Sequence, residues 1–276
     1  MEQIDGKAIA QKIREDIQAQ VRQLTKPPGL AAIRVGEDPA SAIYVKNKRK
    51  ACAAAGIYSE EHALPASTSE SELLALIDRC NRNPNIHGIL VQLPLPAPLQ
   101  ARHILDAVAP EKDIDGFHYL NIGKLVAGEP GFVPCTPLGI IALLRATGVH
   151  ISGAHAVVVG RSDIVGKPTA LLLLHQHATV TLCHSRTQDL GAICRQADIL
   201  VVAAGRPHLI TAEMVKKDAV VIDVGIHRLP GGGLTGDVDF EGVAPHVRAM
   251  TPVPGGVGPM TIAMLLANTL QAARAV

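Results

Sequence analysis

The chain has no tryptophan, and aromatic residues make up only 2% of its 276 residues. A core with so few aromatic rings must be filled by aliphatic side chains, and apolar residues account for 47% of the sequence. Valine, isoleucine, leucine and alanine suit buried parallel strands that are covered by helices. The length is sufficient for two domains of ordinary size.

The chain also lacks an excess of either charge, because 26 lysine and arginine residues face 25 aspartate and glutamate residues. A net charge of +1 gives no indication of a nucleic-acid-binding surface or an acidic tail. No apolar run reaches the ~18 residues of a membrane span, and residues 1–7 show no apolar signal segment. We therefore expect no nucleic-acid partner, no membrane association and a cytoplasmic location.

Paired cysteines and metal-binding spacings are absent as well. The twelve histidines include no H-E-x-x-H pattern, so we expect no metal site. An odd number of scattered thiols fits a reducing compartment better than a disulfide framework. The thiols are Cys52, Cys80, Cys135, Cys183 and Cys194.

Hydrophobic patterning predicts two successive series of alternating strands and helices. In the first series we expect strands at 30–35, 57–64 and 87–93, helices at 4–24, 41–56 and 69–83, and a short helix at 100–108. Residues 110–118 are loop-like, and a long segment then leads to a helix at 138–147. In the second series we expect strands at 156–160, 179–183, 199–203, 219–224 and 249–253, a glycine-rich hairpin at 229–236, and a last helix from 258. This alternation predicts right-handed βαβ units, and hence an α/β fold of two domains with parallel sheets flanked by helices.

The sequence G-R-S-D-I-V-G-K-P, from Gly160 to Pro168, joins an expected strand to an expected helix. This is the arrangement of a dinucleotide site, where a helix N-terminus offers N–H groups and a positive dipole to phosphate. The spacing is not G-x-G-x-x-G, so an ordinary turn in a doubly wound sheet is the alternative.

The end of the following strand distinguishes the two nicotinamide dinucleotides. Proteins that bind NAD usually place a ribose-binding carboxylate there, whereas this chain has Ser185 and Arg186. Together with Arg161, this hydroxyl and guanidinium suit a 2′-phosphate, so we infer NADP over NAD. We expect Asp189, which lies close by, to cap a helix.

Several polar residues outside this loop have both a functional and an ordinary interpretation. Tyr44 and Lys48 are four residues apart on one helix face, which fits a ligand site or a solvated basic face. Gln92 ends a strand, and Asp115 precedes a glycine in a turn signal, where Asp113 is an alternative ligand anchor. The loop from 252 to 259 fits a helix start or a close backbone approach to a ligand.

Six motifs in order carry a family resemblance: S-A-I-Y-V-K-N-K (41–48), V-Q-L-P-L-P (91–96), K-D-I-D-G-F (112–117), P-C-T-P (134–137), G-R-S-D-I-V-G-K-P (160–168) and P-G-G-V-G-P-M-T (254–261). Over nearly its whole length the chain resembles the bacterial bifunctional 5,10-methylenetetrahydrofolate dehydrogenase/cyclohydrolases. The resemblance implies a homodimer of two-domain subunits, with folate in a cleft between the domains and NADP on the second. It implies a folate-binding catalytic domain of residues 1–135 joined by the helix 258–276, and a Rossmann-like domain of residues 136–257.

The resemblance also assigns roles residue by residue. It makes Lys48 the catalytic lysine, Tyr44 the platform that stacks on folate, and Gln92 the partner of the lysine. It implies a substrate-binding group of Asp115, Pro254, Gly255 and Gly256, and a cofactor-binding group of Gly160, Arg161, Ser162, Ser185, Arg186 and Ile226. Two positions depart from the family pattern, Tyr119 where proline is expected and His227 where asparagine is usual, and both put only loop detail in doubt.

The reaction that the resemblance implies has two steps. Hydride leaves 5,10-methylenetetrahydrofolate for NADP⁺, and water then opens the methenyl product to 10-formyltetrahydrofolate. The first step needs alignment, whereas the second needs proton transfer. Because like charge disfavours an ammonium beside a cationic intermediate, Lys48 can serve as a general base. A dehydrogenase of another small substrate and a catalytically inactive nucleotide-binding regulator are the alternatives.

Overall fold

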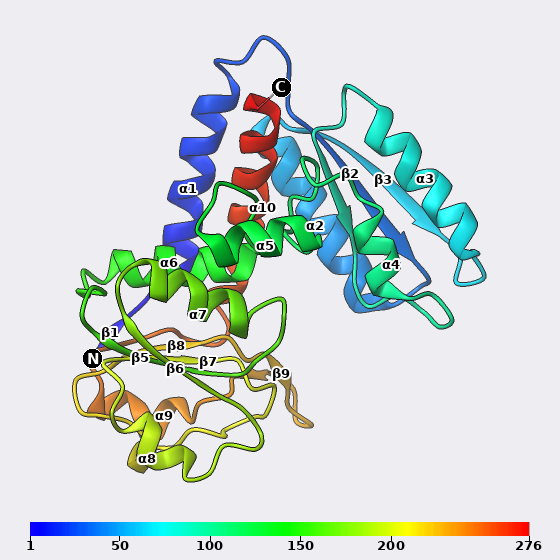
Figure 1. Ribbon diagram of the computed structural model, residues 1–276. Helices are drawn as coiled ribbons and strands as arrows, with labels where there is room; N and C mark the ends of the chain where they lie inside the picture. The colour runs from blue at the N-terminus through cyan, green and yellow to red at the C-terminus, as the bar shows by residue number, and fades with distance from the viewer. Residues whose placement is uncertain (276) are drawn as a thin grey trace. The chain divides into compact units, whose positions relative to one another are not determined.

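The computed structural model describes residues 1–275, except for the side chains of residues 39–44. The chain forms two compact units, each built from two stretches of sequence (Figure 1). The first unit combines Met1–Gln11 with Pro134–Thr261, and the second combines Lys12–Val133 with the chain from Ile262 onward. Among the described residues, no helix has both the length and the apolar character needed to cross a membrane.

The first unit contains a six-stranded parallel sheet with the order β1-β11-β8-β7-β5-β6. The strands are β1 (Glu2–Gln3), β5 (His155–Val159), β6 (Thr179–Cys183), β7 (Ile199–Val202), β8 (Val220–Asp223) and β11 (Ala249–Met250). The central strands β7 and β8 are buried at every position, as the aliphatic runs predicted. β1 was not predicted, because two residues are too short to show a strand pattern. It forms by pairing with β11.

Helices cover both faces of this sheet. α6 (Cys135–Ala146) and α7 (Gly166–His175) lie on one face, and α8 (Leu190–Cys194) and α9 (Phe240–Val243) lie on the other (Figure 1). The α8 side is packed by alternate strand residues such as Val157 and Leu200 against Ile193. Two 3-10 turns, η1 (Ala212–Met214) and η2 (Ala244–His246), and the antiparallel hairpin of β9 (His227–Arg228) and β10 (Leu234–Thr235) complete the unit.

The second unit contains a three-stranded parallel sheet with the order β3-β2-β4. Its strands are β2 (Gly29–Val35), β3 (Tyr58–Leu64) and β4 (Gly88–Val91). α3 (Glu70–Arg82) and α4 (Ala101–Asp106) pack on one face, where Ile33 and Val35 meet Leu73 and Ile77. α2 (Pro39–Ala55) lies on the opposite face, and its Arg49 pairs with Glu61 of β3 at 3.6 Å.

The remaining helices are α1 (Gly6–Val21), α5 (Tyr119–Ala127) and α10 (Val257–Arg274). The capping signal predicted at Ser69 is confirmed, because its hydroxyl accepts from Glu72 N and the Glu72 carboxylate accepts from Ser69 N. α5 was not among the predicted helices, because the segment between residues 118 and 138 was assigned no element. This helix begins with His118, whose Nδ1 accepts from Leu120 N at 3.0 Å, and it ends at Gly128 with φ +76. Histidine is an uncommon N-cap, so the sequence showed no ordinary start signal.

Candidate functional site

In the first unit, the sheet has a topological switch point at the carboxyl end of β5, which lies between β6 and β7. Ligands of doubly wound sheets bind at such points. Gly160 follows β5 with φ +130, and a Cβ there would lie 2.1 Å from Ala203 O. A Cβ on Gly166, the first residue of α7, would lie 1.9 Å from Gly160 O. Positions 160 and 166 therefore both require glycine. Without side chains at these positions, the first turn of α7 can pack directly against the loop that follows β5.

Ser162 lies exposed in this loop and is bonded to the start of α7. Its hydroxyl accepts from Val165 N at 3.2 Å and from Gly166 N at 3.3 Å. The expectation that the N–H groups at this end are available to phosphate is therefore wrong for these two. Arg161 is exposed beside Ser162, so its guanidinium and the helix dipole contribute positive charge at this point. Lys167, in the first turn of α7, is paired with Asp163 at 2.5 Å.

The turn after β6 presents Ser185 and Arg186 at its exposed tip. His184 N donates to Thr187 Oγ1 at 2.8 Å, and Thr187 N donates to His184 O at 2.9 Å, which fixes the turn. Gly160 N donates to Cys183 O at 2.9 Å, so this turn lies beside the glycine loop. Neither residue at the tip is acidic, and a 2′-phosphate would meet a hydroxyl and a guanidinium there.

Asp189 is the nearest carboxylate along the chain after this turn. It accepts from Ala192 N at 3.2 Å as the N-cap of α8, which confirms the predicted cap. The carboxylate of Asp189 therefore caps the N-terminus of α8.

Two buried aspartates organise the loops after β7 and β8. Asp223 accepts from Gly225 N and Asp237 N through Oδ1 and from Val238 N through Oδ2, each at 2.9 Å. Burial raises the pKa of Asp223 to about 6, although these three donors favour the anion and lower it, and the charge of Asp237 raises it slightly further. Ile226, a predicted cofactor residue, is 46% exposed in the loop that follows Asp223.

Asp237 is fully buried and ties together both loops. Its Oδ2 accepts from Ala204 N at 2.6 Å and from Gly205 N at 2.9 Å, and its Oδ1 accepts from Arg206 N at 2.9 Å. His227 Nε2 donates to the same Oδ1 at 2.7 Å. Neither aspartate was identified from the sequence, because a buried carboxylate is recognised only by the backbone donors around it.

The loop that carries Pro254, Gly255 and Gly256 is also held closely within the first unit. Gly255 has φ +108, and a Cβ on Gly6 would lie 1.8 Å from Gly256 O. The start of α1 therefore packs against this loop, with Pro254 exposed and Gly256 buried.

In the second unit, Lys48 Nζ donates to Gln92 Oε1 at 3.1 Å, and both side chains are half-buried. Gln92 directly follows β4, and its backbone N–H donates to Ile33 O at 2.8 Å. Its amide nitrogen donates to Leu93 O at 2.7 Å, which turns the amide oxygen toward the lysine. The predicted contact between Lys48 and Gln92 is thus present, at the carboxyl edge of the parallel sheet.

The predicted stacking residue Tyr44 has a side chain outside the described residues, so its role stays a prediction. Cys52, one turn after Lys48 on α2, is the nearest thiol along the helix. Burial raises the pKa of Cys52 to about 12 although the charge of Lys48 lowers it. This thiol stays protonated near neutral pH and is not a nucleophile.

The loop with the two candidate carboxylates, Asp113 and Asp115, runs beside β4. Ile89 N donates to Lys112 O at 2.8 Å, and Ile89 forms an isolated parallel bridge with Asp113. Asp113 is buried, and its oxygens accept from Phe117 N at 3.1 Å and from His118 N and Asn121 Nδ2 at 2.8 Å. Burial raises the pKa of Asp113, although these hydrogen bonds lower it. Asp115 is half-buried two residues later.

Two buried asparagines hold this loop and were missed by sequence reasoning. Asn121 Nδ2 also donates to Pro110 O at 2.9 Å. Asn268, on α10, donates through Nδ2 to Ile114 O at 2.7 Å and to Val133 O at 3.0 Å. The last helix therefore fixes the residue that precedes Asp115.

Residues 4–115 match the family model "Tetrahydrofolate dehydrogenase/cyclohydrolase, catalytic domain", and residues 134–276 match "Tetrahydrofolate dehydrogenase/cyclohydrolase, NAD(P)-binding domain". The chain belongs to the tetrahydrofolate dehydrogenase/cyclohydrolase family. It is 58% identical to the bifunctional protein FolD of Moorella thermoacetica over 274 residues, which cover 98% of both chains.

Solved structures of this family agree with the fold. The bifunctional FolD enzyme of Campylobacter jejuni is 48% identical, with a TM-score of 0.98 over 100% of this chain and 99% of that one. The Trypanosoma brucei dehydrogenase-cyclohydrolase, solved with NADP cofactor and an inhibitor, is 41% identical, with a TM-score of 0.93 over 99% of this chain and 97% of that one.

The two departures from the family pattern have local partners. Tyr119 starts α5 and lies under the guanidinium of Arg102, which is 3.6 Å from the ring centroid. His227 is bonded to Asp237, as described above.

Proposed function

We propose that the protein oxidises 5,10-methylenetetrahydrofolate to 5,10-methenyltetrahydrofolate with NADP⁺ and then hydrolyses the product to 10-formyltetrahydrofolate. The observation that carries this proposal is the contact between Lys48 and Gln92 at a parallel-sheet edge, in a chain that matches both family models. Relatives are described as bifunctional, and one was solved with NADP cofactor.

The residues of the first unit fit NADP. Gly160 and Gly166 let the loop after β5 pack closely against Ala203 and the start of α7, where a Cβ would collide with backbone. Arg161, Ser185 and Arg186 are exposed near the carboxyl end of β5. We assign Gly160, Arg161, Ser162, Ser185, Arg186 and Ile226 to cofactor binding. When bound, NADP⁺ supplies the acceptor for the hydride that leaves the one-carbon bridge. The residues around it contribute binding and alignment.

Lys48 serves as the proton-transfer residue of the hydrolytic step. Water adds to the methenyl carbon, and Lys48 Nζ takes the proton that the water loses. The bond from carbon to one ring nitrogen then breaks, and Lys48 Nζ returns its proton to that nitrogen. The hydroxyl on the carbon loses its proton to solvent as it becomes the formyl carbonyl. Gln92 Oε1 orients the amine, and such a placed acid–base group typically contributes about 10²- to 10⁴-fold in rate.

Substrate binding is assigned to Asp115, Tyr44 and the loop of Pro254, Gly255 and Gly256. Asp113 is buried and its oxygens accept hydrogen bonds within the loop, whereas Asp115 is only half-buried, and this difference in exposure favours Asp115 as the pterin anchor. A carboxylate can accept paired N–H donors from a 2-aminopyrimidinone edge.

We further assign residues 1–135 with the helix 258–276 to a folate-binding domain and residues 136–257 to an NADP-binding domain. Residues from Ile262 onward belong to the same compact unit as Lys12–Val133, which supports assigning the last helix to the folate-binding domain. Met1–Gln11, in contrast, belong to the same unit as the nucleotide-binding residues. We also propose a homodimer, from the family resemblance, and a cytoplasmic location. All five cysteines are free and buried in the described chain, which fits a reducing compartment.

The test follows both steps in one purified enzyme. NADPH absorbance with methylenetetrahydrofolate reports hydride transfer, and decay of methenyl absorbance reports hydrolysis. Lys48→Met should abolish hydrolysis far more than hydride transfer. Lys50→Met, an exposed lysine two residues further on the same helix, is the matched control and should change neither. Equal loss of both activities in Lys48→Met would contradict the general-base role. If the wild-type enzyme caused no decay of methenyl absorbance, the hydrolytic activity would be refuted and the protein would be a dehydrogenase alone.

A further inference from the structure

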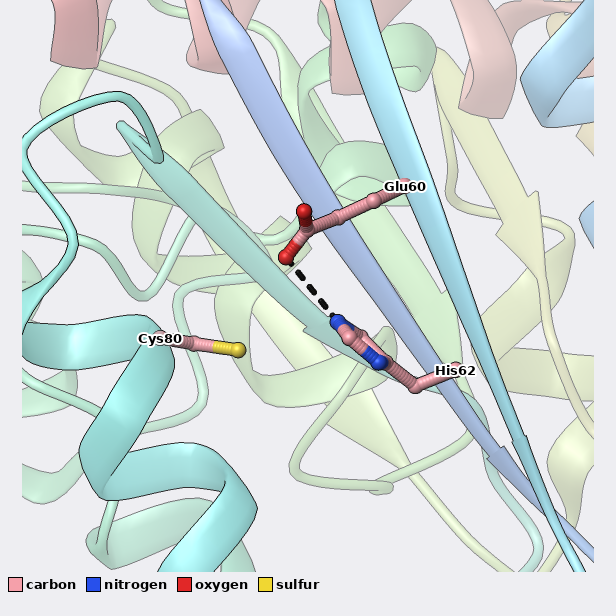
Figure 2. Close-up of side chains that lie close together, drawn as sticks. All are labelled: Glu60, His62 and Cys80. Carbon is pink, nitrogen blue, oxygen red and sulfur yellow. Dashed lines mark hydrogen bonds and ion pairs between the residues drawn. The ribbon is translucent and has the colours of Figure 1, made fainter.

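Three chemically different side chains meet at the outer edge of the second unit's sheet (Figure 2). Glu60 and His62 extend from β3, and Cys80 extends from α3. One ligand atom from each, a carboxylate oxygen, an imidazole nitrogen and a sulfur, lies within 4.8 Å of the other two. His62 Nε2 lies 2.9 Å from Glu60 Oε1.

The strand and helix periods explain why these residues meet. Glu60 and His62 are two apart on a strand, so both point to the face that α3 covers. Cys80 continues the buried stripe of Leu73, Leu76 and Ile77 on α3. β3 is the edge strand of the sheet, so the polar pair borders this core without interrupting it.

The donor set matches one class of metal ion. Thiolate, imidazole and carboxylate are the three ligand types of zinc, whereas magnesium and calcium prefer oxygen alone. In a tetrahedral zinc site with bonds of about 2.0 to 2.3 Å, the ligand atoms are about 3.3 to 3.8 Å apart. The ligand atoms of Glu60, His62 and Cys80 are at most 4.8 Å apart, so side-chain movements of about 1 Å would bring them to the spacing of a zinc site. We propose that Glu60, His62 and Cys80 form a three-ligand site for a zinc-class divalent cation, with solvent in the fourth position.

The surroundings support a metal site. Tyr58, two residues before Glu60, donates through its hydroxyl to Glu60 Oε2 at 3.3 Å, as partners of ligating carboxylates commonly do. The nearby cation Lys112 donates to Cys80 O at 3.2 Å and to Asn83 O at 2.8 Å, so its ammonium group is bonded to carbonyl oxygens.

One of the three side chains borders a pocket, and the thiol carries a proton that a metal must displace. His62 lines a pocket of about 460 Å³ that also borders Leu64 and Arg79, whereas Glu60 and Cys80 do not line it. Burial raises the pKa of the Cys80 thiol, the charge of Glu60 raises it further, and Arg79 and Lys112 lower it. Without metal the sulfur is therefore protonated near neutral pH, and a bound cation displaces that proton.

The metal would link the last turn of α3 to the edge strand β3. It would stabilise the second unit without touching Lys48, which lies on α2 across the sheet from α3. The proposal is therefore independent of the catalytic assignment, and the two can fail separately.

The test titrates the metal-free, full-length protein with Co²⁺, whose thiolate charge-transfer absorption reports a cobalt–sulfur bond. We expect one equivalent to bind with this absorption and Zn²⁺ to displace it. Cys80→Ala should abolish the absorption, and His62→Gln should weaken binding by more than the 10- to 100-fold that is typical of lost outer partners. Tyr58→Phe should weaken binding by about 10-fold.

Two matched controls separate this site from general binding. Cys194→Ala removes a buried thiol in the first unit, and His103→Gln removes a histidine that pairs with Glu70 at 3.6 Å; both should keep the absorption. Zn²⁺ should also raise the Tm of the wild type and both controls but not of His62→Gln, since ligand binding stabilises only the folded state. Absorption that persists in Cys80→Ala, or no cobalt–sulfur absorption in the wild type at stoichiometric metal, would overturn the proposal.

Discussion

Gln92→Glu is the substitution that most directly tests how Lys48 works. Gln92 Oε1 accepts from Lys48 Nζ at 3.1 Å, and the change replaces this neutral acceptor by a carboxylate of nearly the same shape. The carboxylate stabilises the ammonium form of Lys48. A lysine that must lose its proton to act as a base then does so less readily, and hydrolysis slows at neutral pH.

The size of the effect follows from the distance. Coulomb's law at this separation gives about 1 kcal/mol in bulk water and about 5 kcal/mol at the effective dielectric of a protein surface. Both side chains are half-buried, so we take about 2 to 3 kcal/mol. This energy corresponds to a loss of about 30- to 150-fold in hydrolysis at pH 7 and a shift of the pH–rate profile by about two units to higher pH.

The assay measures hydrolysis and hydride transfer separately across pH. Gln92→Met is the matched control, because it removes the acceptor without adding charge. It should slow hydrolysis by misplacing the amine but leave the pH profile where it is. Hydride transfer should change much less in both variants, because that step needs alignment and no base.

The carboxylate also repels Leu93 O, to which the amide nitrogen of Gln92 donates at 2.7 Å. Part of the loss in Gln92→Glu is therefore positional, and the comparison with Gln92→Met measures that part. A pH–rate profile for hydrolysis that is the same in Gln92→Glu and the wild type would refute Lys48 as the base.

Three further predictions concern the ligands and the buried carboxylates. Arg186→Ala should reduce the preference for NADP over NAD by about tenfold or more in kcat/KM, since a charge-assisted phosphate contact is worth about 1.5–3 kcal/mol; an unchanged ratio would refute the assignment. Asp115→Ala should weaken folate binding by a similar factor, measured by ligand titration, whereas unchanged affinity would exclude it as the anchor. The folded-state pKa of Asp223, about 6, exceeds its ordinary 3.8, so the folded state binds this proton more tightly. Its contribution to the free energy of unfolding is therefore full below about pH 4 and lost by about pH 6, a fall of about 3 kcal/mol relative to Asp223→Asn in denaturant titrations.

Much of the fold could be predicted, because its elements carry local signals. Strands such as β5 and β7 are aliphatic runs, and α3 begins with a complete capping box at Ser69 and Glu72. The contact of Lys48 with Gln92 followed from topology. In a parallel sheet both the loop into α2 and the end of β4 lie at the carboxyl edge of the strands, so residues 44 positions apart can meet.

The residues that were missed have partners that no local pattern reveals. Asp237 accepts from three successive backbone N–H groups more than thirty residues earlier, and Asn268 donates to carbonyls more than 130 residues away. Aspartate and asparagine are ordinarily exposed, so their sequence context gave no reason to bury them. Each becomes identifiable only when the loop that it holds has been placed.

The edge of β3 shows the same limit in a different way. Metal sites are recognised in sequence when two ligands share one short motif, whereas here Glu60 and His62 follow the two-residue period of a strand and Cys80 lies on a helix 18 residues later. The sequence E-E-H by itself is also typical of a half-exposed edge strand. Glu61, between the two proposed ligands, points to the other face of the sheet and pairs with Arg49. The thiol distinguishes the two interpretations, because a surface ion pair such as that of Glu70 and His103 needs no sulfur. The cobalt–sulfur absorption is therefore the measurement that separates a metal site from an ordinary ion pair.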